Sequence, residues 1–139
     1  MRWYVLGAAV FVVLASVTAR AHHSPAALYL LDKQIVVEGV VTEYRFVHPH
    51  ARIYLDVTTS GGQVEKWLAE GGSPLVLRRQ GWNGQEVKPG DRVKINGNPA
   101  RDASKLVHWL TVTLPNGSEL FGEDLDFGAV DKRRRQQQN

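Results

Sequence analysis

The stretch that decides the fold is Gln34 to Tyr44, with the sequence QIVVEGVVTEY. Its many β-branched side chains favour the pleated backbone of a strand over a helix. Gly39 interrupts the run, and a glycine inside a strand usually marks a bend or a bulge. The stretch therefore predicts a long strand that bends at a glycine or a bulge.

The residues after this strand predict a hairpin. Ala51 to Thr58 alternates apolar and polar side chains with the period of a half-buried strand. Ser60-Gly61-Gly62 is typical of a turn, and Gln63 to Ala69 follows as a third strand. We interpret Arg45 to His50 as the connection between the first two strands.

The second half predicts one helix and three more strands. Ser73 is a suitable helix cap, and Pro74 at the first helical position sacrifices no hydrogen bond. The helix should end near Gly81. Asn116-Gly117 is typical of a hairpin turn. The strands expected in this half are Arg92 to Asn96, Lys105 to Leu114 and Ser118 to Phe121.

The order of these elements indicates the fold class. Three strands, a short helix, two strands and a hairpin extension are the order of an OB-fold, a small, partly open Greek-key barrel. We therefore predict an all-β fold with one short helix; a generic sandwich or another small barrel is the alternative. Binding surfaces of this fold lie over strands two and three and the adjoining loops. His48 and His50 fall in the first of those loops.

Residues 1–21 resemble a secretory signal. Met1-Arg2 is a positive start, Trp3 to Val17 is an uncharged, mostly apolar run, and Ala19-Arg20-Ala21 offers small residues at the cleavage positions. The alternative is an uncleaved anchor, but the run is shorter than the roughly 20 residues that span a bilayer. We expect cleavage after Ala21 and a periplasmic protein.

The rest of the chain is expected to form a single domain. Residues 22–122 would be an OB-like barrel preceded by an arm from Ser24 to Lys33, and residues 123–139 a disordered basic tail. Residues 22–131 carry 11 basic against 14 acidic side chains, a net charge of −3. This balance argues against a nucleic-acid-binding surface. Lys132 to Arg135 could hold the domain weakly near anionic lipid.

Histidines are the candidate metal ligands, because the chain contains no cysteine. Cleavage after Ala21 would leave His22 as the amino terminus, where the α-amine and ring Nδ1 chelate one ion together. His23 is adjacent, and His48 and His50 would face one site if their segment is extended. Such nitrogen ligands favour Cu(II). Zinc or nickel would also fit them, but less distinctively.

Other interpretations of these histidines stay open. Cleavage after Ala19 would place His22 third in the mature chain, where the amine, two backbone amides and the ring wrap an ion in a plane. Alternatively, His22 and His23 are polar residues of a mobile terminus, and His48 and His50 shape a loop. The fifth histidine, His108, is expected to be a hydrogen-bonded core residue.

No arrangement typical of an enzyme can be found. Carboxylates such as Asp56, Glu65 and Asp102 are spread over strands and turns, and no nucleophile stands beside a base. Trp67, Trp82 and Trp109 are expected to fill the core rather than to form a ligand platform. A binding protein is therefore favoured over an enzyme.

Several short motifs are spread along the chain: Ala21-His22-His23-Ser24, Tyr29, Gly39-Val40-Val41, Pro49-His50-Ala51, Gly72-Ser73-Pro74, Arg79-Gln80-Gly81-Trp82, Lys88-Pro89-Gly90-Asp91 and Pro99-Ala100-Arg101-Asp102. Together they resemble the motifs of a family of small exported bacterial proteins of unknown function. The resemblance runs from about the cleavage site to about Phe121, and it implies export and a small β-barrel without an established activity. The family usually has asparagine at position 48 and aspartate at position 30, where this chain has His48 and Leu30, which leaves His22, His23 and His50 as the better ligands.

Two functions are therefore expected. The first is a periplasmic binding protein that holds a copper ion through His22 and His50, assisted by His23 or His48. The second is a metal-free interaction module that binds a protein or a small envelope component over the second and third strands.

Overall fold

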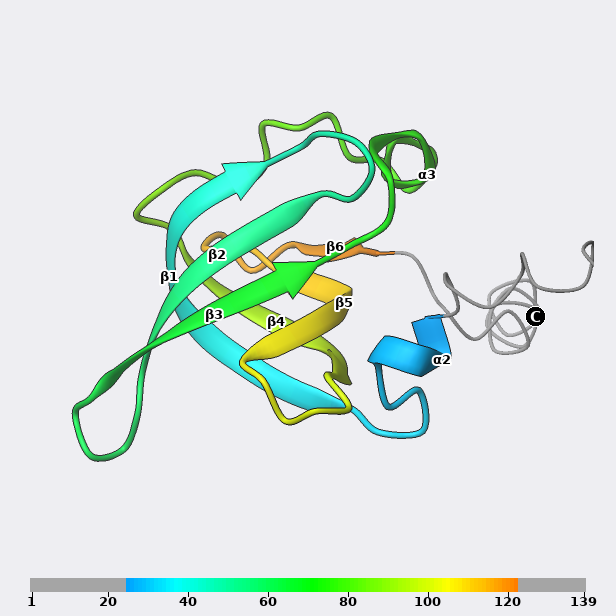
Figure 1. The fold of residues 1–139 in the computed structure, drawn as a ribbon. Helices are drawn as coiled ribbons and strands as arrows, with labels where there is room; N and C mark the ends of the chain where they lie inside the picture. The colour runs from blue at the N-terminus through cyan, green and yellow to red at the C-terminus, as the bar shows by residue number, and fades with distance from the viewer. Residues whose placement is uncertain (1–24, 123–139) are drawn as a thin grey trace, which may run out of the picture.

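The computed structural model describes residues 25–122, which form one sheet wrapped into a small barrel (Figure 1). The elements in chain order are α2 (Pro25–Leu28), β1 (Ile35–Arg45), β2 (Arg52–Thr58), β3 (Val64–Glu70), α3 (Pro74–Arg79), β4 (Arg92–Pro99), β5 (Leu106–Thr113) and β6 (Glu119–Phe121). No helix among residues 25–122 is both long and apolar enough to cross a bilayer.

The strand order confirms the predicted fold. Neighbours follow the order β3-β2-β1-β4-β5-β6, and β3 also pairs with β5, which closes five strands into a barrel and leaves β6 as an extension. All pairings are antiparallel except β3 with β5, where Leu68 pairs with Leu106 and Glu70 with His108. The fold is thus an all-β, OB-like barrel.

The long first strand contains an irregularity of the kind that its sequence predicts, a bulge in its pairing with β2. The register between β1 and β2 shifts between Val41 and Glu43, beyond Gly39. Gly39 has a different role, because a Cβ there would lie 2.7 Å from the carbonyl oxygen of Asp56 on β2. The glycine permits close approach of two strands, and the bulge follows it.

The core fills the barrel with side chains from every long strand and from α3. Trp82 and Trp109 are almost fully buried, as predicted, and their ring centroids lie 5.6 Å apart. Trp67 is only half-buried; its indole N–H donates to Glu65. The other core members include Val37, Val41, Ile53, Leu55, Leu77, Val93, Ile95, Val107 and Val112.

The connections match the sequence signals closely. The hydroxyl of Ser73 accepts a hydrogen bond from the N–H of Val76 at 3.4 Å, and Pro74 opens α3. Gly117 has φ of 84°, as a tight hairpin turn requires, and its N–H donates to the carbonyl of Leu114. These local rules position α3 and the last hairpin.

Candidate functional site

The loop after β1 carries the two predicted histidine ligands that the structure describes. The chain bends at His48 and Pro49, whose peptide bond is cis, so the segment is not the extended one expected from sequence. Both His48 and His50 are exposed. Nδ1 of His50 lies 3.2 Å from the carbonyl oxygen of Gly71, the residue after β3.

This contact determines the tautomer of His50. A carbonyl oxygen only accepts hydrogen bonds, so Nδ1 must carry the proton that it donates to Gly71. In the neutral ring, the remaining nitrogen, Nε2, then keeps its lone pair. A histidine whose Nδ1–H is held by a backbone carbonyl is the usual arrangement of a metal ligand.

The arm that precedes β1 docks beside this loop. The hydroxyl of Tyr29 donates to Oε1 of Glu70 at 3.3 Å, while Nε of Arg52 donates to Oε2 at 3.1 Å. Tyr29 is 3 % exposed. Burial, followed by the negative charge of Glu70, raises the pKa of Tyr29 above its ordinary value. Because Glu70 directly precedes Gly71, the end of the arm and His50 meet the same end of β3.

Other hydrogen bonds fasten the arm to β4 and the loop behind it. The buried amide of Asn98 donates to the carbonyl of Lys33 at 2.7 Å and, more weakly, to those of Leu30 and Leu31. The guanidinium of Arg101 donates to the carbonyl of Ala26 at 2.9 Å. The arm, predicted without regular structure, thus contains one helical turn, α2, held on the barrel.

His108 lies inside this junction. Its side chain is 4 % exposed, and its ring centroid lies 5.4 Å from that of Tyr29. The residue pairs with Glu70 across the parallel β3–β5 ladder. Its burial is what the sequence predicts for a core histidine.

Not all of the predicted ligands fall in the described part of the chain. His22 and His23 lie outside residues 25–122, together with the predicted signal peptide and basic tail. Within residues 25–122, no group of three or more histidine, aspartate or glutamate side chains is placed to hold a metal ion. The four-histidine site stays a prediction, with His50 as its best-defined member.

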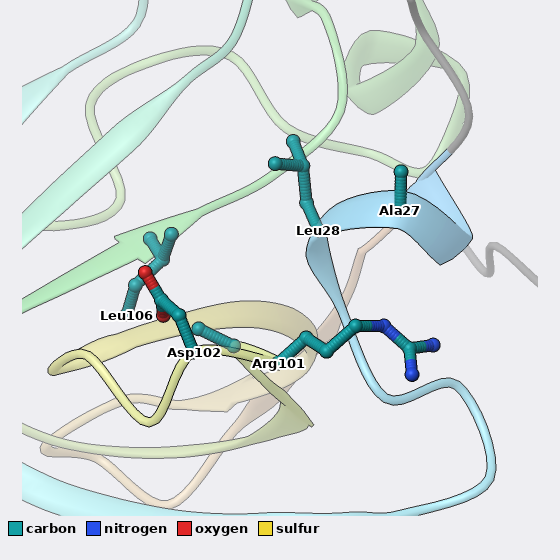
Figure 2. A pocket seen from close by; sticks show the side chains of 6 residues that line it. Ala27, Leu28, Arg101, Asp102 and Leu106 are labelled. Atoms are coloured by element: carbon teal, nitrogen blue, oxygen red, sulfur yellow. The ribbon is translucent and has the colours of Figure 1, made fainter. Parts of the chain in front are cut away.

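A pocket that sequence reasoning missed lies between α2 and the loop before β5 (Figure 2). Its volume is about 270 Å³, and most of its lining is aliphatic. The pocket forms because the arm crosses the barrel, which no local pattern reveals. Its lining residues are Ala27, Leu28, Ala100, Arg101, Asp102 and Leu106.

The polar groups at this pocket do not form a catalytic pair. Hydrogen bonds from Ser104 hold the pKa of the exposed Asp102 carboxyl below its ordinary value. The guanidinium of Arg101 is turned toward α2, where it binds backbone carbonyls (Figure 2). We therefore place the candidate functional site at His50 and the docked arm.

Carboxylates on the hairpin of β2 and β3 are engaged with cations. Lys66 lies 2.6 Å from Asp56, and Lys105 lies 2.9 Å from Glu65. The hydrogen bond from Lys105, aided by that from Trp67, lowers the pKa of Glu65. The face that an OB-like barrel uses for binding thus carries paired charges.

Comparison with known proteins gives the chain a family but no activity. No curated protein matches it. The model of a family described as of unknown function (DUF6152) matches residues 9–107, more than half of the chain. The protein therefore belongs to this family of unknown function, DUF6152.

Proposed function

We propose that the protein is an exported periplasmic barrel that binds one copper ion at the end of β3. His22, as the first residue of the mature chain, would supply its amine and ring nitrogen, and His50 would supply Nε2. His23 or His48 would assist. The contact between Nδ1 of His50 and the carbonyl of Gly71 at 3.2 Å carries the proposal, because a neutral ring that donates from Nδ1 keeps the lone pair of Nε2 for a metal.

The docked arm supports this ligand set, because only a few residues of chain separate α2 from His22 and His23. Tyr29 contacts Glu70, and Glu70 adjoins Gly71, the partner of His50. The helical turn of α2 starts at Pro25, whose carbonyl accepts the N–H of Tyr29 at 2.8 Å. His23 is two residues earlier, a span of about 7 Å when extended. A mature chain that begins at His22 would start three residues before Pro25, the first residue of α2.

The available donors favour copper over other ions. The chain has no cysteine, so a site near His50 must use nitrogen and oxygen ligands. Among divalent ions of the first transition row, Cu(II) binds such ligands most tightly. Copper binding without substrate chemistry would suit storage, delivery or sensing of the metal.

The alternative is a metal-free interaction module that uses the outer face of β2 and β3. On this face, the side chains of Asp56 and Lys66 pair with each other, as do those of Arg52 and Glu70. Paired charges bind a partner less readily than free ones, because the existing pairs must be broken or desolvated. We therefore rank this function second.

The test is the intact mass of the protein exported by its own leader, recorded under native conditions with one equivalent of copper. A mass that begins at His22 and retains one copper against a weak chelator supports the proposal. A mass that retains the leader, or copper that is lost to the chelator, contradicts it.

Substitutions then assign the ligands. His50→Ala should lose tight binding, whereas His48→Ala should weaken it much less. The double variant His22→Ala with His50→Ala is decisive, because unchanged tight binding would eliminate the site.

A further inference from the structure

One end of the barrel exposes most of the large apolar side chains of residues 25–122. This end is formed by α2, the loop after β1, α3 and the end of β6, which gather on one side of Figure 1. Their exposed members are Leu28 at 59 %, Val47 at 55 %, Leu75 at 57 % and Phe121 at 47 %. We call these four side chains the apolar rim.

Contacts join three of these elements, α3, the loop after β1 and β6. The guanidinium of Arg78 on α3 lies 5.4 Å from the ring centroid of Phe46, which precedes Val47. The indole N–H of Trp82, just after α3, donates to the carbonyl of Phe121 at 2.7 Å. The rim residues of α3, the β1–β2 loop and β6 thus belong to neighbouring elements.

Two arginines stand beside the rim without a carboxylate partner. Arg78 and Arg79 are exposed on α3, three and four positions after Leu75, so the three side chains share one helix face. Neither arginine forms an ion pair with a carboxylate of residues 25–122. Their charges are available to an external anion.

Two carboxylates near this end of the barrel are already hydrogen-bonded, whereas Glu119 on β6 is exposed. Glu86, in the loop after α3, accepts the backbone N–H groups of Asn83 and Gly84. Glu70 accepts from Tyr29 and Arg52. The unpaired charge that points outward from α3 is therefore positive.

Both ends of the described chain also leave the barrel here. Pro25 opens α2, and the N–H of Gly122, directly after β6, donates to Leu110 at 2.7 Å. The chain after Gly122 includes the basic run from Lys132 to Arg135, which follows the acidic residues Glu123, Asp124, Asp126 and Asp131.

We propose that this barrel end docks on an anionic phospholipid surface. Transfer of exposed apolar side chains into the interface of a bilayer lowers the free energy of the system. Nearby cations add electrostatic attraction to anionic headgroups. Arginine suits this role because its planar guanidinium binds phosphate oxygens in pairs. The docking depends on Leu75, Arg78 and Arg79 and requires no copper.

The test is cosedimentation of the protein, as exported by its own leader, with lipid vesicles. Vesicles of phosphatidylglycerol and phosphatidylethanolamine should retain it, whereas vesicles of phosphatidylcholine should not. Arg78→Gln with Arg79→Gln should lower the partition constant about fivefold for each charge removed. The double variant Val47→Ser with Leu75→Ser should lower the partition constant by a factor similar to that of the double arginine variant.

Matched controls come from other parts of the barrel surface. Val64 on β3 is as exposed as Leu75, and Lys88 and Lys94 are exposed cations of the β4 region. Val64→Ser, and Lys88→Gln with Lys94→Gln, should leave binding nearly unchanged. Deleting residues 132–139 should weaken binding without abolishing it.

Three outcomes would overturn the inference. The first is no binding to phosphatidylglycerol vesicles. The second is an equal loss from the control variants. The third is complete loss from deletion of the tail while the α3 variants bind like the wild type. Circular dichroism of each variant would verify that the barrel is intact.

Discussion

The hydroxyl of Tyr29 donates to Oε1 of Glu70 at 3.3 Å, although 41 positions separate the two residues. The bond joins the arm to the end of β3, one residue from the carbonyl that receives His50. Tyr29→Phe removes the donor and keeps the ring against His108. We expect it to lower the free energy of unfolding by about 1 kcal/mol, measured by urea denaturation.

The same variant should loosen the arm locally. Amide hydrogen exchange at residues 25–30 should accelerate in Tyr29→Phe, while exchange in the barrel strands changes only with global stability. Equal acceleration throughout the protein would show that the hydroxyl does not act on the arm specifically.

The buried Tyr29 and the partly buried Tyr44 predict a loss of stability in alkali. Burial raises the pKa of Tyr29 and of Tyr44 above the ordinary value of 10.0, with Glu70 and Glu86 adding to the effect. A raised pKa means that the folded chain keeps protons that the unfolded chain loses. The resulting stabilisation is complete below pH 10.0 and disappears as the pH rises through the folded pKa values.

Urea unfolding measured on both sides of pH 10.0 should show this decline. The decline should be shallower in Tyr29→Phe and in Tyr44→Phe than in the wild type. An identical pH dependence in all three proteins would contradict the assignment to these phenols.

Gly71 should tolerate no side chain. A Cβ at this position would collide with the indole ring of Trp109, which is fully buried. Overpacking of this kind costs about 1–3 kcal/mol, so Gly71→Ala should lower the urea midpoint markedly. Gly61→Ala is the matched control: only the Thr59 hydroxyl lies within 4 Å of the added Cβ, at 3.9 Å, and stability should change little. Equal effects of the two substitutions would argue against the close approach of Gly71 to Trp109.

Asn98 should contribute more than its neighbour Asn96. The buried amide of Asn98 donates to three carbonyls of the segment before β1. Asn98→Ala should cost about 1–3 kcal/mol, because these hydrogen bonds are lost together. Asn96 makes one exposed hydrogen bond, to Gln34, and Asn96→Ala should cost distinctly less in the same thermal or urea titration.

The elements that the sequence predicts well are those with local causes. Apolar alternation indicates β2, Ser73 and Pro74 indicate the start of α3, and Asn116-Gly117 indicates the last turn. The sequence predicts an end of β4 at Asn96, which is too early. The observed strand extends to Pro99, because Gly97 to Pro99 pair with β5 beyond a register irregularity. Such an extension depends on the partner strand and leaves no mark in its own residues.

The candidate site is less predictable for the same reason. The histidine types and their loop can be read from the sequence, since both depend on a few neighbouring residues. The contact of His50 with Gly71 and the contact of Tyr29 with Glu70 exist only because the barrel closes. The ring nitrogen of His50 that donates and the position of the arm can therefore be assigned only from the tertiary structure.

The parallel pairing of β3 with β5 also governs when the chain can fold during synthesis. The edge of β3 at Leu68 has no partner until Leu106 has been made, and β1 similarly waits for β4. A nascent chain that ends before Leu106 can form the β2–β3 hairpin but not the closed barrel. The barrel must therefore assemble late, after most of the polypeptide exists, and folding should be slow relative to proteins built from local contacts.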